Sequence, residues 1–318
     1  MTKTKKWIIA GAALLGAGII TCTAALAALG FDFKKLGTVE LVTNTYEVSG
    51  DFENITITGD TEDITFVRSE DGSCKVLCRE EKDALHQVTA ENNTLTITKN
   101  SARKIRIFSI MAESPKITVY LPKDSYDALK INADTGDVTI PDAFSFGQIS
   151  VTLDTGDCTC NASASDKISI RTDTGDIRLS GISAAGLELT SDTGDMKLTD
   201  VTLSGELRIE EDTGDVTAQN LTCTKFTAKG ETGDLSMTNV TASEAFDLKS
   251  DTGDITFSGC DAEAIYVRTD TGDVTGTLRS DKVFLTETDT GDVSVPKTVT
   301  GGRCEISTDT GDIRIKVQ

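Results

Sequence analysis

Paired carboxylates recur at a fixed spacing through the C-terminal part of this chain. Ten copies of one tetrad, nine Asp-Thr-Gly-Asp and one Glu-Thr-Gly-Asp, follow each other at steps of 19 or 20 residues. Carboxylate oxygens are the ligands that Ca²⁺ prefers, and carboxylate pairs also serve in acid–base catalysis. The closing aspartates are the candidate metal ligands: Asp137, Asp157, Asp176, Asp195, Asp215, Asp234, Asp254, Asp273, Asp292 and Asp312.

Catalysis by these carboxylates is not indicated. Asp-Thr-Gly also surrounds the carboxylate of an aspartic protease, but that enzyme needs two copies face to face that share a proton. Here ten copies lie in line, and a second Asp follows each one, which adds charge where such a dyad must limit it. The only histidine, His86, has no partner that the sequence reveals, and we expect a satisfied structural role for it. Aromatic residues make up only 5% of the chain, so a carbohydrate-active enzyme stays a remote alternative. We predict that the protein is not an enzyme.

The tetrads account for the charge of the chain. It has 51 acidic and 31 basic residues, and the 20 tetrad acids match the formal net charge of −20 one for one. Such acidity argues against nucleic acid as a partner and is compatible with cations or basic proteins. Two charges about 4.8 Å apart repel by about 0.9 kcal/mol in water, so stacked aspartates would attract cations without needing a specific site. No cofactor is required; calcium is the alternative for the aspartates, although their spacing differs from the calcium-binding nonapeptide repeat.

The period of the tetrads predicts the fold. Self-similarity at about 20 residues is typical of a solenoid, in which one supersecondary unit is stacked along an axis. Within one repeat, apolar residues alternate with polar ones in three short runs, which predicts three strands with one buried face and three corners. We therefore predict an all-β, single-stranded β-solenoid (β-helix) of 19–20-residue coils over residues 134–318. One repeat places these residues inward: Met196, Leu198, Val201, Leu203, Leu207 and Ile209.

The tetrad itself is predicted to form a corner. Glycine is the third of four residues, the position that needs a positive φ in a type II turn. The closing Asp precedes an inward residue by one, so its side chain should point outward. Phe246 and Phe284 fall in inward columns and are predicted to lie in the core.

Residues 32–133 are predicted to form irregular N-terminal β coils. The stretch Asp60-Thr61-Glu62-Asp63 differs from a tetrad at one position, and apolar alternation continues through most of this segment. Five of the eight cysteines, from Cys158 to Cys304, occupy core columns of the repeats. Cys74 and Cys78 are the only other pair close enough to suggest a disulfide.

The N-terminus predicts export. Residues 1–6 carry three lysines and would form a cytoplasmic tail, while residues 7–31 contain no charge and are long enough for one transmembrane helix. A signal peptide cleaved near Ala25-Leu26-Ala27 is the alternative. In both cases the C-terminal body is extracytoplasmic: anchored in the cell membrane by a single pass, or secreted. At the other end, Ile313, Ile315 and Val317 predict a last strand without a cap, so end-to-end self-association is possible.

The order of these segments resembles a bacterial family of β-strand-repeat proteins, a domain of unknown function whose members are labelled putative adhesins. The resemblance rests on recurring Gly-Asp-apolar coils and on three stretches before them: Phe52-Glu53-Asn54-Ile55, Glu91-Asn92-Asn93-Thr94-Leu95-Thr96-Ile97 and Ile117-Thr118-Val119-Tyr120-Leu121-Pro122. It implies an envelope-associated repeat protein with no active site to carry over. We therefore expect a non-enzymatic surface protein of the cell envelope, an adhesin-like or interaction scaffold whose partners the sequence does not identify.

Overall fold

The computed structural model describes residues 11, 14–21, 23–24, 27, 39–99 and 114–318. The predicted tail, residues 1–6, lies outside this part, and so does much of the predicted membrane segment, of which residues 14–21 are helical. None of the helical stretches in the described ranges is long and apolar enough to cross a membrane.

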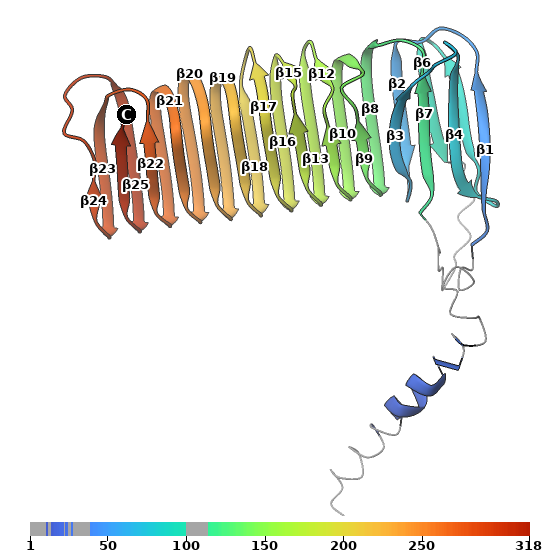
Figure 1. The fold of residues 1–318 in the computed structure, drawn as a ribbon, viewed down its shortest axis with the longest axis horizontal. Helices are drawn as coiled ribbons and strands as arrows, with labels where there is room; N and C mark the ends of the chain where they lie inside the picture. Colours follow the sequence, from blue (N-terminus) through green and yellow to red (C-terminus); the bar gives the residue numbers. More distant parts are fainter. Residues whose placement is uncertain (1–10, 12–13, 22, 25–26, 28–38, 100–113) are drawn as a thin grey trace, which may run out of the picture.

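The described body is a β-solenoid, as predicted. Strands that follow one tetrad pair in parallel and in register with those that follow the next, and the strands before the tetrads do the same. Figure 1 shows the result, a rod in which roughly one coil corresponds to each tetrad. The regular part contains these strands: β8 (Ser125–Thr135), β9 (Val138–Ile140), β10 (Ser145–Thr155), β11 (Cys158–Cys160), β12 (Ser163–Ala164), β13 (Lys167–Thr174), β14 (Ile177–Ser180), β15 (Ser183–Ala184), β16 (Gly186–Thr193), β17 (Met196–Leu203), β18 (Leu207–Thr213), β19 (Val216–Thr232), β20 (Leu235–Thr252), β21 (Ile255–Thr271), β22 (Val274–Leu278), β23 (Lys282–Thr290), β24 (Val293–Ser294), β25 (Gly302–Thr310) and β26 (Ile313–Val317).

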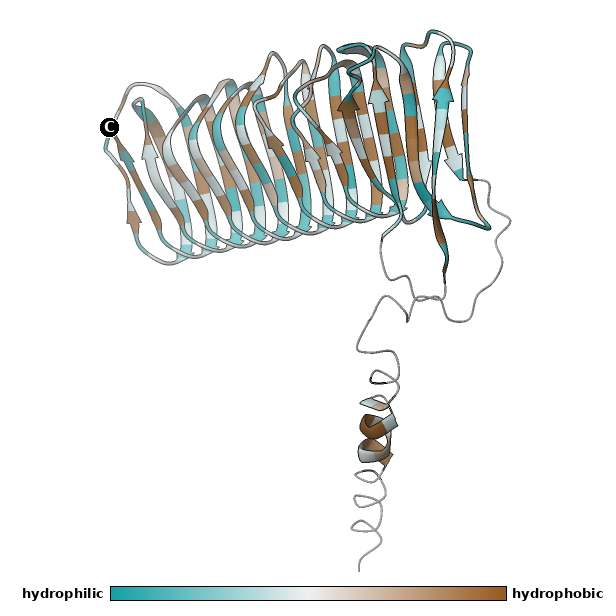
Figure 2. Ribbon diagram, turned by 45° about the vertical axis from the view of Figure 1, so that its right-hand side comes forward, coloured by the Kyte–Doolittle hydropathy of each residue, from teal (hydrophilic) through white to brown (hydrophobic). Residues whose placement is uncertain are grey.

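The alternation of the sequence fills the interior of the rod. In β19 the buried residues are the alternate apolar ones, and Figure 2 shows the same banding of hydrophobic and hydrophilic residues along neighbouring strands. Phe226, Phe246 and Phe257 are buried and contact one another from coil to coil. Phe246 meets Phe226 edge to face and stacks on Phe257, with ring centroids 6.3 Å apart in both pairs. The core position predicted for Phe246 is confirmed, whereas Phe284 is only half-buried because its coil lies at the end of the rod.

The N-terminal cap, residues 39–99 and 114–121, is built differently from the regular coils. β2 and β3 join the stack in parallel, but β4 pairs antiparallel with β1 and β7, and β5 forms an antiparallel hairpin with β6. The prediction of irregular coils missed these antiparallel pairs because an antiparallel strand has the same period of two as a coil strand. The cap contains β1 (Leu41–Val48), β2 (Asn54–Gly59), β3 (Asp63–Arg68), β4 (Cys74–Glu81), β5 (His86–Glu91), β6 (Thr94–Lys99) and β7 (Lys116–Leu121).

The last two coils are stacked in the reverse of their sequence order. β25 pairs with β21 on one side and with β23 on the other, and β26 lies between β22 and β24 in the same way. The prediction that the final strand forms an open last coil was therefore wrong. The coil at the end of the rod is the preceding one, made by β23 and β24, and Val293 in it is 45% exposed.

The cysteines of the described part are buried and reduced. Cys158, Cys160, Cys223, Cys260 and Cys304 lie in the core, as the columns of the repeat predict. Cys74 and Cys78 are also buried and free, so they do not form the disulfide that their proximity suggested. Desolvation raises the pKa of the Cys160 thiol to about 12, which keeps it protonated and unreactive.

Candidate functional site

The tetrad corners form a single file along one edge of the rod. Each tetrad glycine has a φ between +123° and +154°, so the predicted positive φ is confirmed, but the values lie well above the roughly +80° of a type II turn. A Cβ on any of these glycines would lie 1.8 to 2.4 Å from a carbonyl oxygen of the adjacent corner. Glycine is therefore required twice, for its φ and for the close approach of stacked backbones.

The closing aspartates lie on this edge and link one corner to the next. The Oδ1 atom of Asp137 accepts the backbone N–H of Asp157 at 2.9 Å, and Asp157 accepts that of Asp176 at the same distance. The pattern continues through all ten aspartates at 2.6 to 3.1 Å, starting from Asp63 in the cap. We call this chain of bonds the aspartate ladder. Its spatial order is Asp137, Asp157, Asp176, Asp195, Asp215, Asp234, Asp254, Asp273, Asp312 and Asp292.

The direction of the backbone explains why the fourth residue is Asp. At a corner, the N–H groups of Gly156 and Cys158 both donate to carbonyls of the following coil. The N–H of the residue between them, Asp157, faces the preceding coil and donates to the Asp137 side chain. A short side chain with an oxygen acceptor is needed there, since an unpaired backbone N–H is unfavourable. The closing acid is thus part of the stacking mechanism.

The second oxygen of these carboxylates is differently occupied along the ladder. Arg178 pairs with both Asp157 and Asp176, and Arg314 pairs with Asp312. Desolvation opposes ionisation of Asp157, but the N–H of Asp176 and the Arg178 guanidinium outweigh it and lower its pKa. Within the ranges that the structure describes, no basic side chain lies within ion-pair distance of a central group: Asp195, Asp215, Asp234, Asp254 and Asp273.

This geometry limits what the ladder can coordinate. One oxygen of each aspartate except Asp292, the last in the stack, is already an acceptor for the backbone. The free oxygens of neighbouring corners are roughly one coil apart, about 4.8 Å. Calcium takes six to eight oxygens at 2.3–2.6 Å, so the remaining ligands of an ion here would be waters.

A second corner row, one of the three corners predicted for each coil but without a predicted site residue, runs alongside the first. Asp200, Asn220 and Asn239 have φ values of 54° or 55°, and Gly181 and Gly259 occupy the same place in other coils. Asn239 donates to Asn220, which donates to Asp200, so amides link these corners. The signal was present in the sequence, because Asn, Asp and Gly are the residues that adopt a left-handed conformation most readily.

The cap holds a buried cluster of charged groups. His86 Nδ1 lies 2.6 Å from Glu80 Oε2, and His86 Nε2 lies 3.6 Å from Glu62 Oε1. Lys99 Nζ lies 2.9 Å from the same Glu62 oxygen. The other oxygen of Glu80 accepts from Asn44 and Tyr46 in β1. His86 is therefore only partly satisfied: Nδ1 pairs with Glu80, whereas Nε2 is buried without a hydrogen-bond partner. Glu80 and Glu62, which face the two ring nitrogens, lie on β4 and in the turn before β3, a proximity that the sequence could not reveal.

The two glutamates of this cluster are ionised. Desolvation opposes this for both Glu62 and Glu80, but hydrogen bonds from neighbouring backbone and side-chain donors outweigh it and lower each pKa. For Lys99, desolvation is in turn outweighed by Glu62, and its pKa is raised. Cys78 lies close enough to Glu80 and His86 for the three to surround a metal ion, but the ammonium of Lys99 already provides the positive charge beside Glu62. The cluster is better described as an ion-pair network that joins the strands of the cap.

One carboxyl group lies inside the regular coils. Glu211 is buried in a column that holds Ser191 and Ser250 in other coils, and Gly230 in the adjacent coil leaves room for it. Desolvation raises its pKa to about 8, and Asp212, Asp195 and Asp215 add to the effect. Glu211 Oε1 has no hydrogen-bond partner. The buried Glu211 carboxyl group therefore destabilises the fold, and it was not among the predicted site residues.

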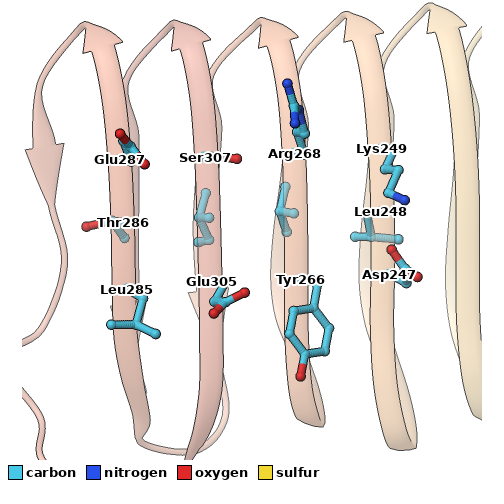
Figure 3. A pocket seen from close by; sticks show the side chains of 12 residues that line it. Asp247, Leu248, Lys249, Tyr266, Arg268, Leu285, Thr286, Glu287, Glu305 and Ser307 are labelled. Carbon is cyan, nitrogen blue, oxygen red and sulfur yellow. The ribbon is translucent and has the colours of Figure 1, made fainter.

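The outer face of the last coils carries a hollow of about 550 Å³. Its floor is formed by outward residues of β20, β21, β25 and β23, which lie side by side in Figure 3. Tyr266 stands between Asp247 and Glu305, and Lys249 and Arg268 lie in the next row. We call these five residues the Tyr266 surface. No residue of this surface was among the predicted site residues.

Comparison with known proteins identifies the family of the chain. A family profile described as Toastrack DUF4097 matches residues 52–212 and 205–318. The chain belongs to the Toastrack DUF4097 family. No curated protein is significantly similar to this Toastrack protein in sequence.

Several solved structures resemble the Toastrack protein at low identity. A putative adhesin from Bacteroides fragilis is 18% identical, with a TM-score of 0.36, and the alignment covers 87% of this chain and 97% of that one. A putative lipid binding protein from Parabacteroides distasonis is 14% identical, with a TM-score of 0.46 and coverage of 88% and 98%. A putative adhesin from the same species is 15% identical, with a TM-score of 0.41 and coverage of 76% and 98%.

Proposed function

We propose that the protein is a non-enzymatic scaffold of the bacterial cell envelope, which presents the outer face of its rod to partners. The observation that carries the proposal is the stack itself. Inward side chains fill the interior of the regular coils up to the open end coil, so chemistry is available mainly on the outer faces, and these repeat at a fixed spacing. A surface of this kind suits binding and display.

The location of this scaffold follows from the N-terminal sequence. The uncharged segment of residues 7–31, preceded by lysines, supports a single-pass anchor with the body outside, and a cleaved signal peptide remains the alternative. Cells that express the full chain should keep it in the membrane fraction, and a protease added outside should degrade the body. Recovery of the body in the medium would support cleavage. Protection from the external protease would contradict the proposal.

The proposal assigns no catalytic step to the acidic groups. The ladder carboxylates are hydrogen-bonded in single file, and Asp247 and Glu305 of the Tyr266 surface lie on strands that flank β21 rather than facing each other across a cleft. If the purified chain released shortened products from an oligosaccharide, that result would instead support the remote alternative that the protein is a carbohydrate-active enzyme.

Calcium binding by the aspartate ladder is a second proposal. Its support is the run from Asp195 to Asp273, in which each aspartate has one oxygen that is not used by the ladder and no basic partner in the described ranges. Thermal unfolding of the chain in chelator, in millimolar Ca²⁺ and in matched Mg²⁺ tests it. A midpoint that Ca²⁺ raises no more than Mg²⁺ would leave only general cation attraction.

End-to-end association through the open coil is a third proposal, which a specific observation favours. Val293 and Val299 are exposed at the end of the rod, and β23 has a strand partner on only one side. Exposed edges of this kind promote pairing between molecules. Sedimentation of the detergent-solubilised chain over a range of concentrations should show dimers, and a monomer at every concentration would exclude them.

A further inference from the structure

Among the aromatic side chains that the structure describes, only Tyr266 stands out from the rod. It is 39% exposed, and every other aromatic residue in the described ranges is buried or half-buried. An aromatic residue in the outward row of a strand adds nothing to the core, because the inward neighbours Ile265 and Val267 fill that role. Exposed aromatic rings are typical of binding surfaces, where one face packs on a ligand and the polar end stays hydrated.

The reversed order of the last coils places a second carboxylate beside this ring. Tyr266 pairs in register with Asp247 on one side and with Glu305 on the other. If the coils followed the sequence, β23 would lie next to β21, and its outward residue Leu285 would take the place of Glu305. The exchange therefore creates a platform flanked by two carboxylates, as Figure 3 shows.

The adjacent row supplies hydrogen-bond donors. Lys249, Arg268 and Ser307 lie in register two residues further along the same strands, and Lys249 and Arg268 are exposed. With Glu287 at the edge, the hollow has three carboxylates and two cations, so neither sign dominates. A strongly charged polymer would meet repulsion from one set of these groups. A neutral ligand with many hydroxyls could donate to the carboxylates and accept from the cations.

We propose that the Tyr266 surface binds a neutral saccharide chain, with one sugar ring stacked on Tyr266 and its hydroxyls bonded to Asp247 and Glu305. The inference rests on the proposed function, in which the outer face of the rod contacts partners. A pyranose ring presents an apolar face of C–H groups and a rim of hydroxyls, which matches an aromatic ring between hydrogen-bonding side chains. The hollow of about 550 Å³ has the size of a small-ligand site.

The test uses the full chain in detergent and three probes: chitotetraose and cellotetraose, which are neutral, and polygalacturonate, which is anionic. Binding is measured by titration calorimetry. At least one neutral probe should bind, and Tyr266→Ala should weaken it at least severalfold, because the aromatic platform for the sugar ring is lost. Tyr266→Phe should retain most of the affinity, because the ring remains. Glu305→Gln should weaken binding severalfold.

The matched control is Thr227→Ala, which lies in the same outward row one coil beyond Asp247 and should leave binding unchanged. Three outcomes would overturn the inference: no binding of either neutral probe, equal binding by Tyr266→Ala and the unmodified chain, or tighter binding of polygalacturonate than of the neutral probes. Protease accessibility on cells is measured separately. A chain that reaches the cell surface but binds no sugar would refute the saccharide and leave the scaffold intact.

Discussion

The cap and the regular coils use acidic residues in opposite ways. In the cap, Glu62 and Glu80 are completely buried and each is fixed by donors from several strands. In the coils, the ladder aspartates are near the solvent, and each except Asp292 at the open end accepts one backbone N–H from the next corner. Burial makes every partner in the cap necessary, because water cannot solvate a buried charge that has lost its partner. Because the corners repeat, the loss of one ladder aspartate should cost little stability, since the neighbouring corners keep the coils in register.

The largest effect should come from breaking the ion-pair network of the cap. Lys99→Met removes the ammonium that lies 2.9 Å from Glu62. The Glu62 carboxylate then stays buried with only the backbone N–H groups of Asp60 and Thr61 as hydrogen-bond donors. We expect a loss of about 3–5 kcal/mol in the stability of the cap, the usual cost of an uncompensated buried charge. Hydrogen exchange of β4 to β6 measures it separately from the coils.

Lys82→Met is the control for this change. Lys82 also lies in the cap and pairs with Glu40, but both side chains are more than half exposed. Its loss should cost less than about 1 kcal/mol. Equal losses for the two variants would mean that the buried network does not distinguish the cap from an ordinary surface.

The stacked glycines should give the next largest effect. In Gly233→Ala the new Cβ would lie 1.8 Å from the Gly214 carbonyl oxygen, and the residue would keep a φ of +145°. We expect a loss of roughly 2–4 kcal/mol, since strain and displacement of a coil combine. Gly50→Ala has a φ of +108° but open space around it, so it isolates the strain. Urea unfolding of both variants should show a clearly smaller loss for Gly50→Ala, and similar losses would contradict the role of close stacking.

These differences show how far the sequence could predict the molecule. The columns of Leu, Ile and Phe predicted the solenoid and its register, because burial of one face repeats with the coil. Glu211 could have been recognised, since it replaces Ser or Thr in a regular column. The exchange of the last two coils could not have been predicted. Both coils contain the same Thr-Asp-Thr-Gly-Asp sequence, and either order of stacking satisfies the same register. The Tyr266 surface depends on that exchange, so it too was hidden.

The buried acid of the coils should reveal itself through pH. The pKa of Glu211 is raised to about 8 in the folded chain, whereas an unfolded glutamate titrates near 4.5. Between these values the unfolded chain releases a proton that the folded chain keeps, so stability falls as the pH rises from about 4.5 to 8. Glu211→Gln removes this dependence, and we expect it to stabilise the protein by roughly 2–3 kcal/mol at pH 8 and by little at pH 4. The control Glu206→Gln, at an exposed position, should follow the unmodified chain at every pH. Melting curves of the three proteins at pH 4 and pH 8 test this prediction. If Glu211→Gln leaves the pH dependence of stability unchanged, Glu211 is not its cause.

The smallest effect should come from the ladder itself. Asp215→Ala removes the acceptor of the Asp234 N–H, whose bond is 2.9 Å long, and water can replace it only partly at an exposed corner. We expect a loss of about 0.5–1.5 kcal/mol, the usual net worth of one hydrogen bond. Asp215→Asn keeps an oxygen acceptor and removes a charge between Asp195 and Asp234, so at low salt it should be neutral or slightly stabilising. Comparing the two variants by thermal unfolding in low and high salt separates the hydrogen bond from the charge. If Asn is as damaging as Ala, the carboxylate charge does more in the ladder than accept a backbone N–H, and bound cations become the first explanation to test.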